Sequence, residues 1–258
     1  MTGIDPTAVV DPEARLADDV VVGPYAVIGA GVQIDSGCWV GPHAVINGPT
    51  HIAADSRVFQ FASVGEVPQD KKYHGEESRL EIGRRNTIRE CVTINRGTAD
   101  GGGTTRLGDD NWIMAYVHIA HDCQVGNGVV FANGASLAGH VEVGDRVTLG
   151  GFSLVHQFCR LGQGCFTAMG SCIRQDVPPW VMVAGDPAEP HGTNSEGLRR
   201  QGFDQAAQQR LRNAYRLLYK RGLRLAEALE TIEAEAQGDP AIMEFLAFLR
   251  ASPRGIVR

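Results

Sequence analysis

Four of the eight histidines in the chain lie close together in the sequence, namely His118, His121, His140 and His156. Imidazole titrates near neutral pH, so a histidine can take up a proton and return it during catalysis. Asp122 directly follows His121 and offers a carboxylate that can orient its ring. These residue types favour general acid–base chemistry, provided that the fold brings them together.

An aliphatic residue recurs at every sixth position over most of the chain. The pattern runs from Ile4 to Val64, returns briefly at Ile82, and runs again from Leu107 to Ile173. A period of six fits neither a helix nor a simple alternating strand, but it does fit a short strand plus a turn with one inward side chain. Three such units make a triangular coil, the architecture that is typical of hexapeptide β-helix repeats.

The chain changes character near residue 190. Residues 195–222 and 224–236 have helical spacing, and the segment after Pro240 is expected to form a third helix with the proline near its start. We therefore expect an all-β parallel β-helix over residues 1–190, with loop excursions near 66–80 and 97–105. A small α-helical C-terminal domain is expected over residues 191–258.

The coil period predicts which of the chemically active residues meet. Residues one coil apart stack at the sheet spacing, so His121, Gly139 and Gln157 share one column, with about 9.6 Å between its ends. Asp122 and His140 stand one residue beside this column. We therefore expect a site at this corner of the coil.

Composition excludes several classes of protein. The 258 residues include 24 Lys and Arg against 30 Asp and Glu, a net charge of −6 that argues against a nucleic-acid-binding surface. No apolar run of about 18 residues is present, so no transmembrane segment is expected. The N-terminal sequence has no secretory signal, which favours a cytoplasmic location. The six cysteines form no CxxC pair and are expected to be small buried side chains.

Seven segments closely resemble the acyl-carrier-protein:UDP-N-acetylglucosamine O-acyltransferase family, which begins lipid A synthesis in Gram-negative bacteria. They occur in the family's order over nearly the full length: FASVGEVPQDKKYHGE, IRECVTINRGT, HIAHDC, LAGH, VHQFC, QDVPPWV and NSEGLRRQGF. The resemblance implies a left-handed β-helix and a homotrimer with its active sites at subunit interfaces. It also implies transfer of a 3-hydroxyacyl chain from an acyl carrier protein to the 3-hydroxyl of UDP-GlcNAc, without a cofactor or a resident metal.

The resemblance also implies roles for individual residues. His121 would be the general base, oriented by Asp122, and the backbone N–H of Gly139 would stabilise the developing oxyanion. Contacts with the sugar nucleotide or the acyl donor are implied for Asp70, Lys72, His118, His140, His156, Gln157, Asn194, Glu196 and Arg200. The acidic carrier protein would dock on a basic helical face made of Arg199, Arg200, Arg216, Lys220, Arg221 and Arg224.

Two residues depart from the family pattern or vary within it. Asn95 stands near the sugar where many members have a histidine, and we hypothesise that it favours the 3-amino analogue of the sugar as acceptor. The resemblance implies that Met169 lies at the end of the acyl groove, at a position where members differ between glycine and larger residues. Its bulk predicts a donor of about ten carbons, because each buried methylene contributes ~0.8 kcal/mol.

Other functions stay open. Trimeric hexapeptide carbonic anhydrases bind zinc through three histidines across a subunit interface, and His118 and His121 could form half of such a site. A sister hexapeptide N-acyltransferase acts one step later on a glucosamine amine, but its members usually carry an N-terminal domain that this sequence does not show. A purely structural solenoid would not need histidines stacked at one corner.

Overall fold

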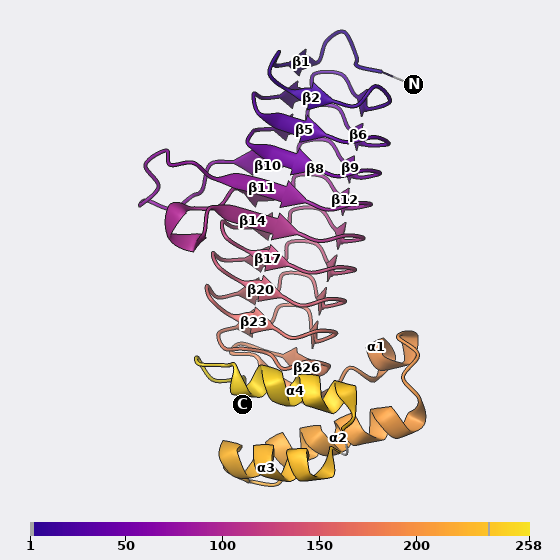
Figure 1. The fold of residues 1–258 in the computed structure, drawn as a ribbon, viewed down its shortest axis with the longest axis vertical. Coiled ribbons are helices and arrows are strands. Elements are labelled where there is room, and N and C mark those ends of the chain that lie inside the picture. Colours follow the sequence, from indigo (N-terminus) through magenta and orange to yellow (C-terminus); the bar gives the residue numbers. More distant parts are fainter. Residues whose placement is uncertain (1–2, 237) are drawn as a thin grey trace.

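The computed structural model of the protein describes residues 3–236 and 238–258. The chain forms a three-sided, left-handed β-helix, and α-helices cover its C-terminal end (Figure 1). The predicted fold class is therefore confirmed, including a hand that departs from the usual right-handed crossover between parallel strands.

Each side of the prism is one sheet, which we call sheet I, II or III. Sheet I consists of β1 (Val9–Val10), β4 (Val27–Ile28), β7 (Val45–Ile46), β10 (Ser63–Glu66), β13 (Thr93–Asn95), β16 (His118–Ile119), β19 (Ser136–Leu137), β22 (Leu154–Val155) and β25 (Cys172–Ile173). Sheet II consists of β2 (Arg15–Leu16), β5 (Val32–Ile34), β8 (Thr50–Ile52), β11 (Arg79–Ile82), β14 (Thr104–Leu107), β17 (Gln124–Val125), β20 (Glu142–Val143) and β23 (Arg160–Leu161). Sheet III consists of β3 (Val21–Val22), β6 (Trp39–Val40), β9 (Arg57–Val58), β12 (Thr87–Ile88), β15 (Trp112–Ile113), β18 (Val130–Phe131), β21 (Thr148–Leu149), β24 (Phe166–Thr167), β26 (Val181–Ala184) and β27 (Glu189–Thr193), of which β27 runs antiparallel to β26.

The repeated aliphatic residues fill the interior of the prism. In sheet I, for example, Ile94, Ile119 and Leu137 stand in register on successive coils and are fully buried. Burial of apolar surface contributes roughly 25 cal/mol per Å². Each coil therefore stabilises its neighbours through a stack of aliphatic side chains.

Two members of the pattern behave differently. Ile4 is 51% exposed because it belongs to the first coil, where it pairs with Val22 on the next coil. Thr167 is fully buried, yet its hydroxyl lies 2.7 Å from the Ser153 hydroxyl and accepts a hydrogen bond from the Gly150 N–H. The core thus tolerates a hydroxyl where a partner satisfies it.

Both loop excursions leave the coil at the same corner, where the chain passes from sheet I to sheet II, which we call the I/II corner. The 66–80 excursion connects β10 to β11 and includes the adjoining ends of both strands. The 97–105 excursion connects β13 to β14, includes the start of β14 and contains a short 3₁₀ helix, Ala99–Gly101. They project side by side from one edge of the prism (Figure 1), and the Arg79 N–H donates to the Gly103 carbonyl.

The C-terminal segment forms α1 (Ser195–Arg200), α2 (Gln205–Tyr219), α3 (Leu225–Glu235) and α4 (Pro240–Arg250). The helix expected over 195–222 is thus two helices and ends at Tyr219. The chain breaks at Gly202, which has a positive φ of 78°, and the Asp204 side chain then caps α2. β27 spans the boundary near residue 190, so the division into residues 1–190 and 191–258 stays a proposal. Within the described ranges, no helix has the length and apolar character needed to cross a membrane.

The stacking account predicts unequal costs for equal substitutions in one column. Ile113 is fully buried in the middle of sheet III, whereas Ile4 stands at the open end of the same column. Ile113→Ala should lower the free energy of unfolding by about 2–5 kcal/mol, and Ile4→Ala by about 0.5 kcal/mol or less. Thermal unfolding followed by circular dichroism measures both, and equal losses would contradict the account.

Candidate active site

The I/II corner brings the predicted catalytic residues together. His121 and Asp122 lie in the turn between β16 and β17, and the equivalent turn of the next coil carries Gly139 and His140. The His121 ring packs directly over the backbone of Gly139, where a Cβ would lie 2.5 Å from the His121 Cε1. A glycine is therefore required at position 139 to leave room for the imidazole.

His121 and Asp122 form a hydrogen-bonded pair. The His121 Nδ1 lies 2.8 Å from the Asp122 Oδ2, and the Asp122 side chain is only 1% exposed. A carboxylate can only accept this bond, so the His121 Nδ1 carries the proton and its Nε2 is left with a free lone pair. The pair has the geometry of a general base and its orienting carboxylate.

The Asp122 carboxylate accepts two further hydrogen bonds, both from Thr98 in the 97–105 excursion. The Thr98 backbone N–H donates to Oδ1 over 2.8 Å, and its hydroxyl donates to Oδ2 over 2.6 Å. Burial acts to raise the pKa of Asp122, but the hydrogen bonds from His121 and Thr98 outweigh burial and hold that pKa below its ordinary value. Asp122 is therefore charged at neutral pH.

His140 is a second imidazole beside the pair. Its Nδ1 lies 3.8 Å from the Asp122 Oδ2, and its ring stacks on Phe158 at a centroid distance of 4.5 Å. Burial lowers the pKa of His140 more than the nearby carboxylates of Asp122, Asp70 and Asp100 raise it. The ring is consequently neutral at pH 7 and can both donate and accept a hydrogen bond.

Three other predicted residues share this region of the prism. His118 lies on sheet I with its Nδ1 2.7 Å from the Thr93 hydroxyl, and burial lowers the pKa of His118. His156 and Gln157 are exposed in the I/II turn of the following coil, where the His156 Nδ1 donates to the Gln157 carbonyl.

The 66–80 excursion extends from the same corner and carries Asp70 and Lys72. The Asp70 carboxylate accepts a hydrogen bond from the Lys72 N–H over 3.0 Å, which stabilises the turn and leaves the Lys72 side chain exposed. Asn95 is 3% exposed beneath this excursion, and its amide donates to the Val67 carbonyl over 2.9 Å. Within the described residues the Asn95 Oδ1 accepts no hydrogen bond.

Four predicted substrate-binding residues lie elsewhere on this chain. Met169 is 80% exposed in a turn between β24 and β25, at the corner between sheets III and I. Asn194, Glu196 and Arg200 belong to α1 or its N-cap. Figure 1 shows α1 on the opposite side of the prism from the two excursions. One copy of the chain therefore does not bring these four residues to His121.

The α1 residues are engaged with one another and with the end of the solenoid. The Asn194 side chain accepts a hydrogen bond from the Gly197 N–H and donates to the Gly164 carbonyl. The guanidinium groups of Arg199 and Arg200 pair with Glu196 and hold its pKa at about 2.

Sequence reasoning missed two contributors to this corner. Thr98 is 24 residues from Asp122, and the intervening excursion removes it from the 18-residue register, so periodicity gives no signal for their contact. Phe158 follows His140 by one coil, so the same periodicity does predict its stacking contact.

Cys123 has no nucleophilic role in this geometry. Its thiol is fully buried and donates to the Ala138 carbonyl, and burial raises the pKa of Cys123 to about 12. The thiolate that a nucleophile needs is thus absent at neutral pH.

The cluster of His121, Asp122 and His140 also has the spacing of a possible metal site, with ligand atoms within 4.8 Å of one another. Both carboxylate oxygens already accept hydrogen bonds, from Thr98 and His121. A metal ion on Nδ1 of His121 would have to displace the proton that joins the pair. The donor set therefore fits a hydrogen-bonded dyad better than a zinc centre.

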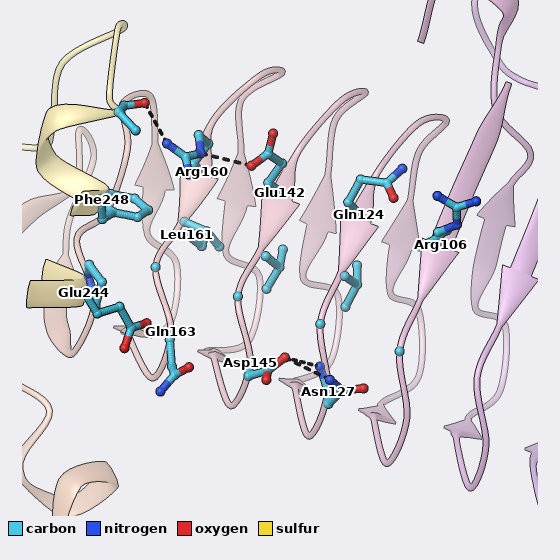
Figure 2. Close-up of a pocket in the computed structure, with 18 of the residues that line it drawn as sticks. Arg106, Gln124, Asn127, Glu142, Asp145, Arg160, Leu161, Gln163, Glu244 and Phe248 are labelled. Carbon is cyan, nitrogen blue, oxygen red and sulfur yellow. Dashed lines mark hydrogen bonds and ion pairs between the residues drawn. The ribbon is translucent and has the colours of Figure 1, made fainter. Parts of the chain in front are cut away.

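A separate groove of about 780 Å³ lies between sheet II and α4 (Figure 2). Arg160 joins its two walls, since the guanidinium donates to Glu142 and to the Ala251 carbonyl and lies over the Phe248 ring. None of the predicted site residues lines this groove, which is the seam between the solenoid and α4.

Comparisons with known proteins agree with this architecture. Residues 176–257 match the family model described as UDP N-acetylglucosamine O-acyltransferase, domain 2, and residues 104–139 match that of the bacterial transferase hexapeptide (six repeats). Acyl-[acyl-carrier-protein]–UDP-N-acetylglucosamine O-acyltransferases from Alkalilimnicola ehrlichii and Thiobacillus denitrificans are 56% and 54% identical to this chain, over 100% of each chain. The crystal structure of UDP-N-acetylglucosamine O-acyltransferase from Moraxella catarrhalis superposes with a TM-score of 0.96 at 42% identity, covering 99% of both chains. The chain therefore belongs to the family of acyl-[acyl-carrier-protein]–UDP-N-acetylglucosamine O-acyltransferases.

Proposed function

We propose that this protein transfers a 3-hydroxyacyl chain from acyl carrier protein to the 3-hydroxyl of UDP-GlcNAc, the first step of lipid A synthesis, in the cytoplasm. The observation that carries this proposal is the pairing of His121 with the buried, charged carboxylate of Asp122. It leaves the His121 Nε2 as a base in a corner where the chain has two excursions for holding substrates.

In the proposed reaction, Nε2 of His121 takes the proton of the sugar 3-hydroxyl as that oxygen attacks the thioester carbonyl carbon. The C–O bond forms, the C–S bond breaks, and the imidazolium returns its proton to the leaving sulfur, which becomes a thiol. Asp122 stabilises the imidazolium between these two events. The step needs no metal and no covalent enzyme intermediate.

Negative charge develops on the carbonyl oxygen during this attack, and the proposed donor of a hydrogen bond to that oxygen is the Gly139 N–H. Within the described residues, the Gly139 N–H donates to no protein acceptor. The His121 ring lies against the same glycine, so the base and the N–H donor adjoin one another. A donor fixed in advance at the position of a developing oxyanion stabilises the transition state.

The proposed assembly is a homotrimer with sites between copies. A band of exposed apolar side chains follows sheet I and the corner between sheets III and I, and exposed apolar patches of this kind can mark surfaces that another protein chain covers. It consists of Val9, Val27, Leu154, Tyr25, Phe61, Tyr116, Phe152 and Met169. His118 lies on the same sheet, so a second copy covering this face would complete the site with its own Met169 or α1.

The α2 end of the molecule is the proposed docking surface for the acidic carrier protein. Arg216, Lys220 and Arg221 are exposed, and within the described residues none forms an ion pair, whereas Arg199, Arg200 and Arg224 are paired with glutamates. Unpaired exposed cations attract an acidic partner and speed its association.

The 3-amino analogue of UDP-GlcNAc is the second candidate acceptor. It is favoured by Asn95, whose buried Oδ1 receives no hydrogen bond from the part of the chain that the structure describes, while its amide supports the 66–80 excursion. An amine offers one more hydrogen than a hydroxyl to such an acceptor. Mass spectrometry of products from an equimolar mixture of the two sugars decides between them, and equal or better use of UDP-GlcNAc removes this candidate.

Replacement of His121 tests the general base. His121→Ala should lower kcat by about 10²- to 10⁴-fold, the usual contribution of such a base. The matched control is His51→Ala, because His51 lies on sheet II and pairs with Asp35 away from the I/II corner. Product formation by both variants is followed by mass spectrometry, with wild-type enzyme treated with a chelator in parallel. Loss of wild-type activity on chelation would favour the zinc alternative. Retention of activity by His121→Ala would show that His121 is not the general base.

Mixed assemblies test whether copies share a site. His121→Ala and Arg200→Ala should each be inactive alone, because each removes one side of every site. Co-expression should restore about one quarter of the sites, where an intact His121 meets an intact Arg200 from another copy. A co-expressed sample as inactive as its parents would place both residues within one chain.

Met169 is expected to limit the length of the acyl chain. Met169→Gly should shift the preference towards longer donors, with about a fourfold gain in kcat/KM for each methylene newly accommodated. Met243→Ala is the control, since Met243 is an exposed methionine on α4. Competition among 3-hydroxyacyl carrier proteins of different lengths gives the profile, and an unchanged profile would show that Met169 does not close the groove.

A further inference from the structure

The 97–105 excursion closes over the Asp122 carboxylate. Thr98 supplies two donors to it, and the Thr105 hydroxyl accepts a hydrogen bond from the Asp122 backbone N–H over 2.7 Å. A Cβ on Gly101 would overlap the carboxylate, and one on Gly97 would lie 2.8 Å from Oδ1. The small residues of this segment therefore let the main chain pack against Asp122 and exclude water from it.

We propose that Thr98 is a positioning residue of the acyl transfer, whose hydroxyl and N–H fix the Asp122 carboxylate, keep it charged and thereby set the orientation of His121. This inference rests on the proposed role of His121 as general base. Thr98 itself touches no reacting atom, since it acts through Asp122.

The argument for orientation is geometric. Asp122 Oδ2 accepts from the Thr98 hydroxyl and from His121 Nδ1, over 2.6 and 2.8 Å, so the two donors hold one oxygen between them. The Thr98 N–H holds the other oxygen, so rotation of the carboxyl group about its bond to Cβ would break three hydrogen bonds. Supporting hydrogen bonds of this kind keep a catalytic ring in its productive geometry.

The argument for charge is electrostatic. Burial acts to raise the pKa of Asp122, but the hydrogen bonds from His121 and Thr98 hold that pKa below its ordinary value. Loss of the Thr98 hydroxyl removes one of these hydrogen bonds and therefore raises the pKa of Asp122. Other titratable groups around the pair are His118, His140, Asp70 and Asp100, and none of them contacts the Thr98 hydroxyl.

The excursion also links Asp122 to the loop that carries Asp70 and Lys72. Arg79 ends the 66–80 excursion, and it donates to the Gly103 carbonyl and to the Thr104 hydroxyl of the 97–105 segment. A displacement of the 66–80 excursion would therefore also move the 97–105 excursion and, with it, Thr98.

Thr98→Val and Thr98→Ser test the proposal, because valine has the shape of threonine without the hydroxyl and serine keeps the hydroxyl. For Thr98→Val we expect kcat to fall about 10- to 100-fold with little change in KM, by analogy with outer hydrogen bonds to metal-bound histidines. The acid limb of the kcat/KM profile should move to higher pH, since Asp122 loses a hydrogen bond that lowers its pKa and then takes up a proton at higher pH. Thr98→Ser should restore both the rate and the position of the limb.

Thr104→Val is the matched control, because Thr104 lies in the same excursion and its hydroxyl contacts Arg79 but not Asp122. A merely structural role for Thr98 predicts that Thr98→Val loses thermal stability and activity with an unmoved acid limb. That result, or wild-type kcat in Thr98→Val, would overturn the proposal. If Thr98→Val does not fold, Thr98→Ser still tests the proposal, because serine keeps the hydroxyl. An acid limb of Thr98→Ser that lies at clearly higher pH than that of the wild type would then overturn the proposal.

His121→Ala, measured beside these variants, separates the two claims. An inactive His121→Ala with an unaffected Thr98→Val removes only the role of Thr98. An active His121→Ala would show that His121 is not the general base, and the proposed role of Thr98 would then fail with it.

Discussion

Stacking of one aliphatic side chain per six residues is the constraint on which the whole molecule depends. Because Ile94, Ile119 and Leu137 must lie in register to fill the interior, residues at equivalent positions of successive coils are held at one corner. The candidate site follows from this register, because the register brings its residues together at the I/II corner. His121 lies over Gly139, and His140 lies over Phe158, because each pair differs by one coil. A slip of one coil would separate all four.

The register explains why so much could be predicted from the sequence. The six-residue period fixes the fold class, and the coil length fixes which of the histidines meet. The hand of the helix and the role of His121 came from the resemblance of whole segments to a family, since periodicity alone specifies neither. Predictions failed where the repeat ends. The expected helix over 195–222 breaks at Gly202, where a positive φ and the Asp204 cap separate α1 from α2.

The excursions mark the other limit of sequence reasoning. The glycines of RGTADGGGTT fit a flexible turn or a ligand cradle equally well, whereas in the structure Gly97 and Gly101 pack against Asp122. No spacing rule relates Thr98 to Asp122, because an insertion interrupts the period between them. Similarly, the position of α1 on the opposite side of the prism from the two excursions became visible only in the structure (Figure 1). This position supports the proposal that a second copy completes the site.

The buried, charged carboxylate of Asp122 is the centre of the functional account, since it fixes the tautomer of His121. Replacement of Asp122 by asparagine keeps the shape and removes the charge, so kinetics of Asp122→Asn test the account most directly. We expect kcat to fall by about 100-fold or more, with a thermal midpoint close to that of the wild type, because an amide does not hold the productive tautomer of the ring. A kcat within about threefold of the wild type would contradict the account.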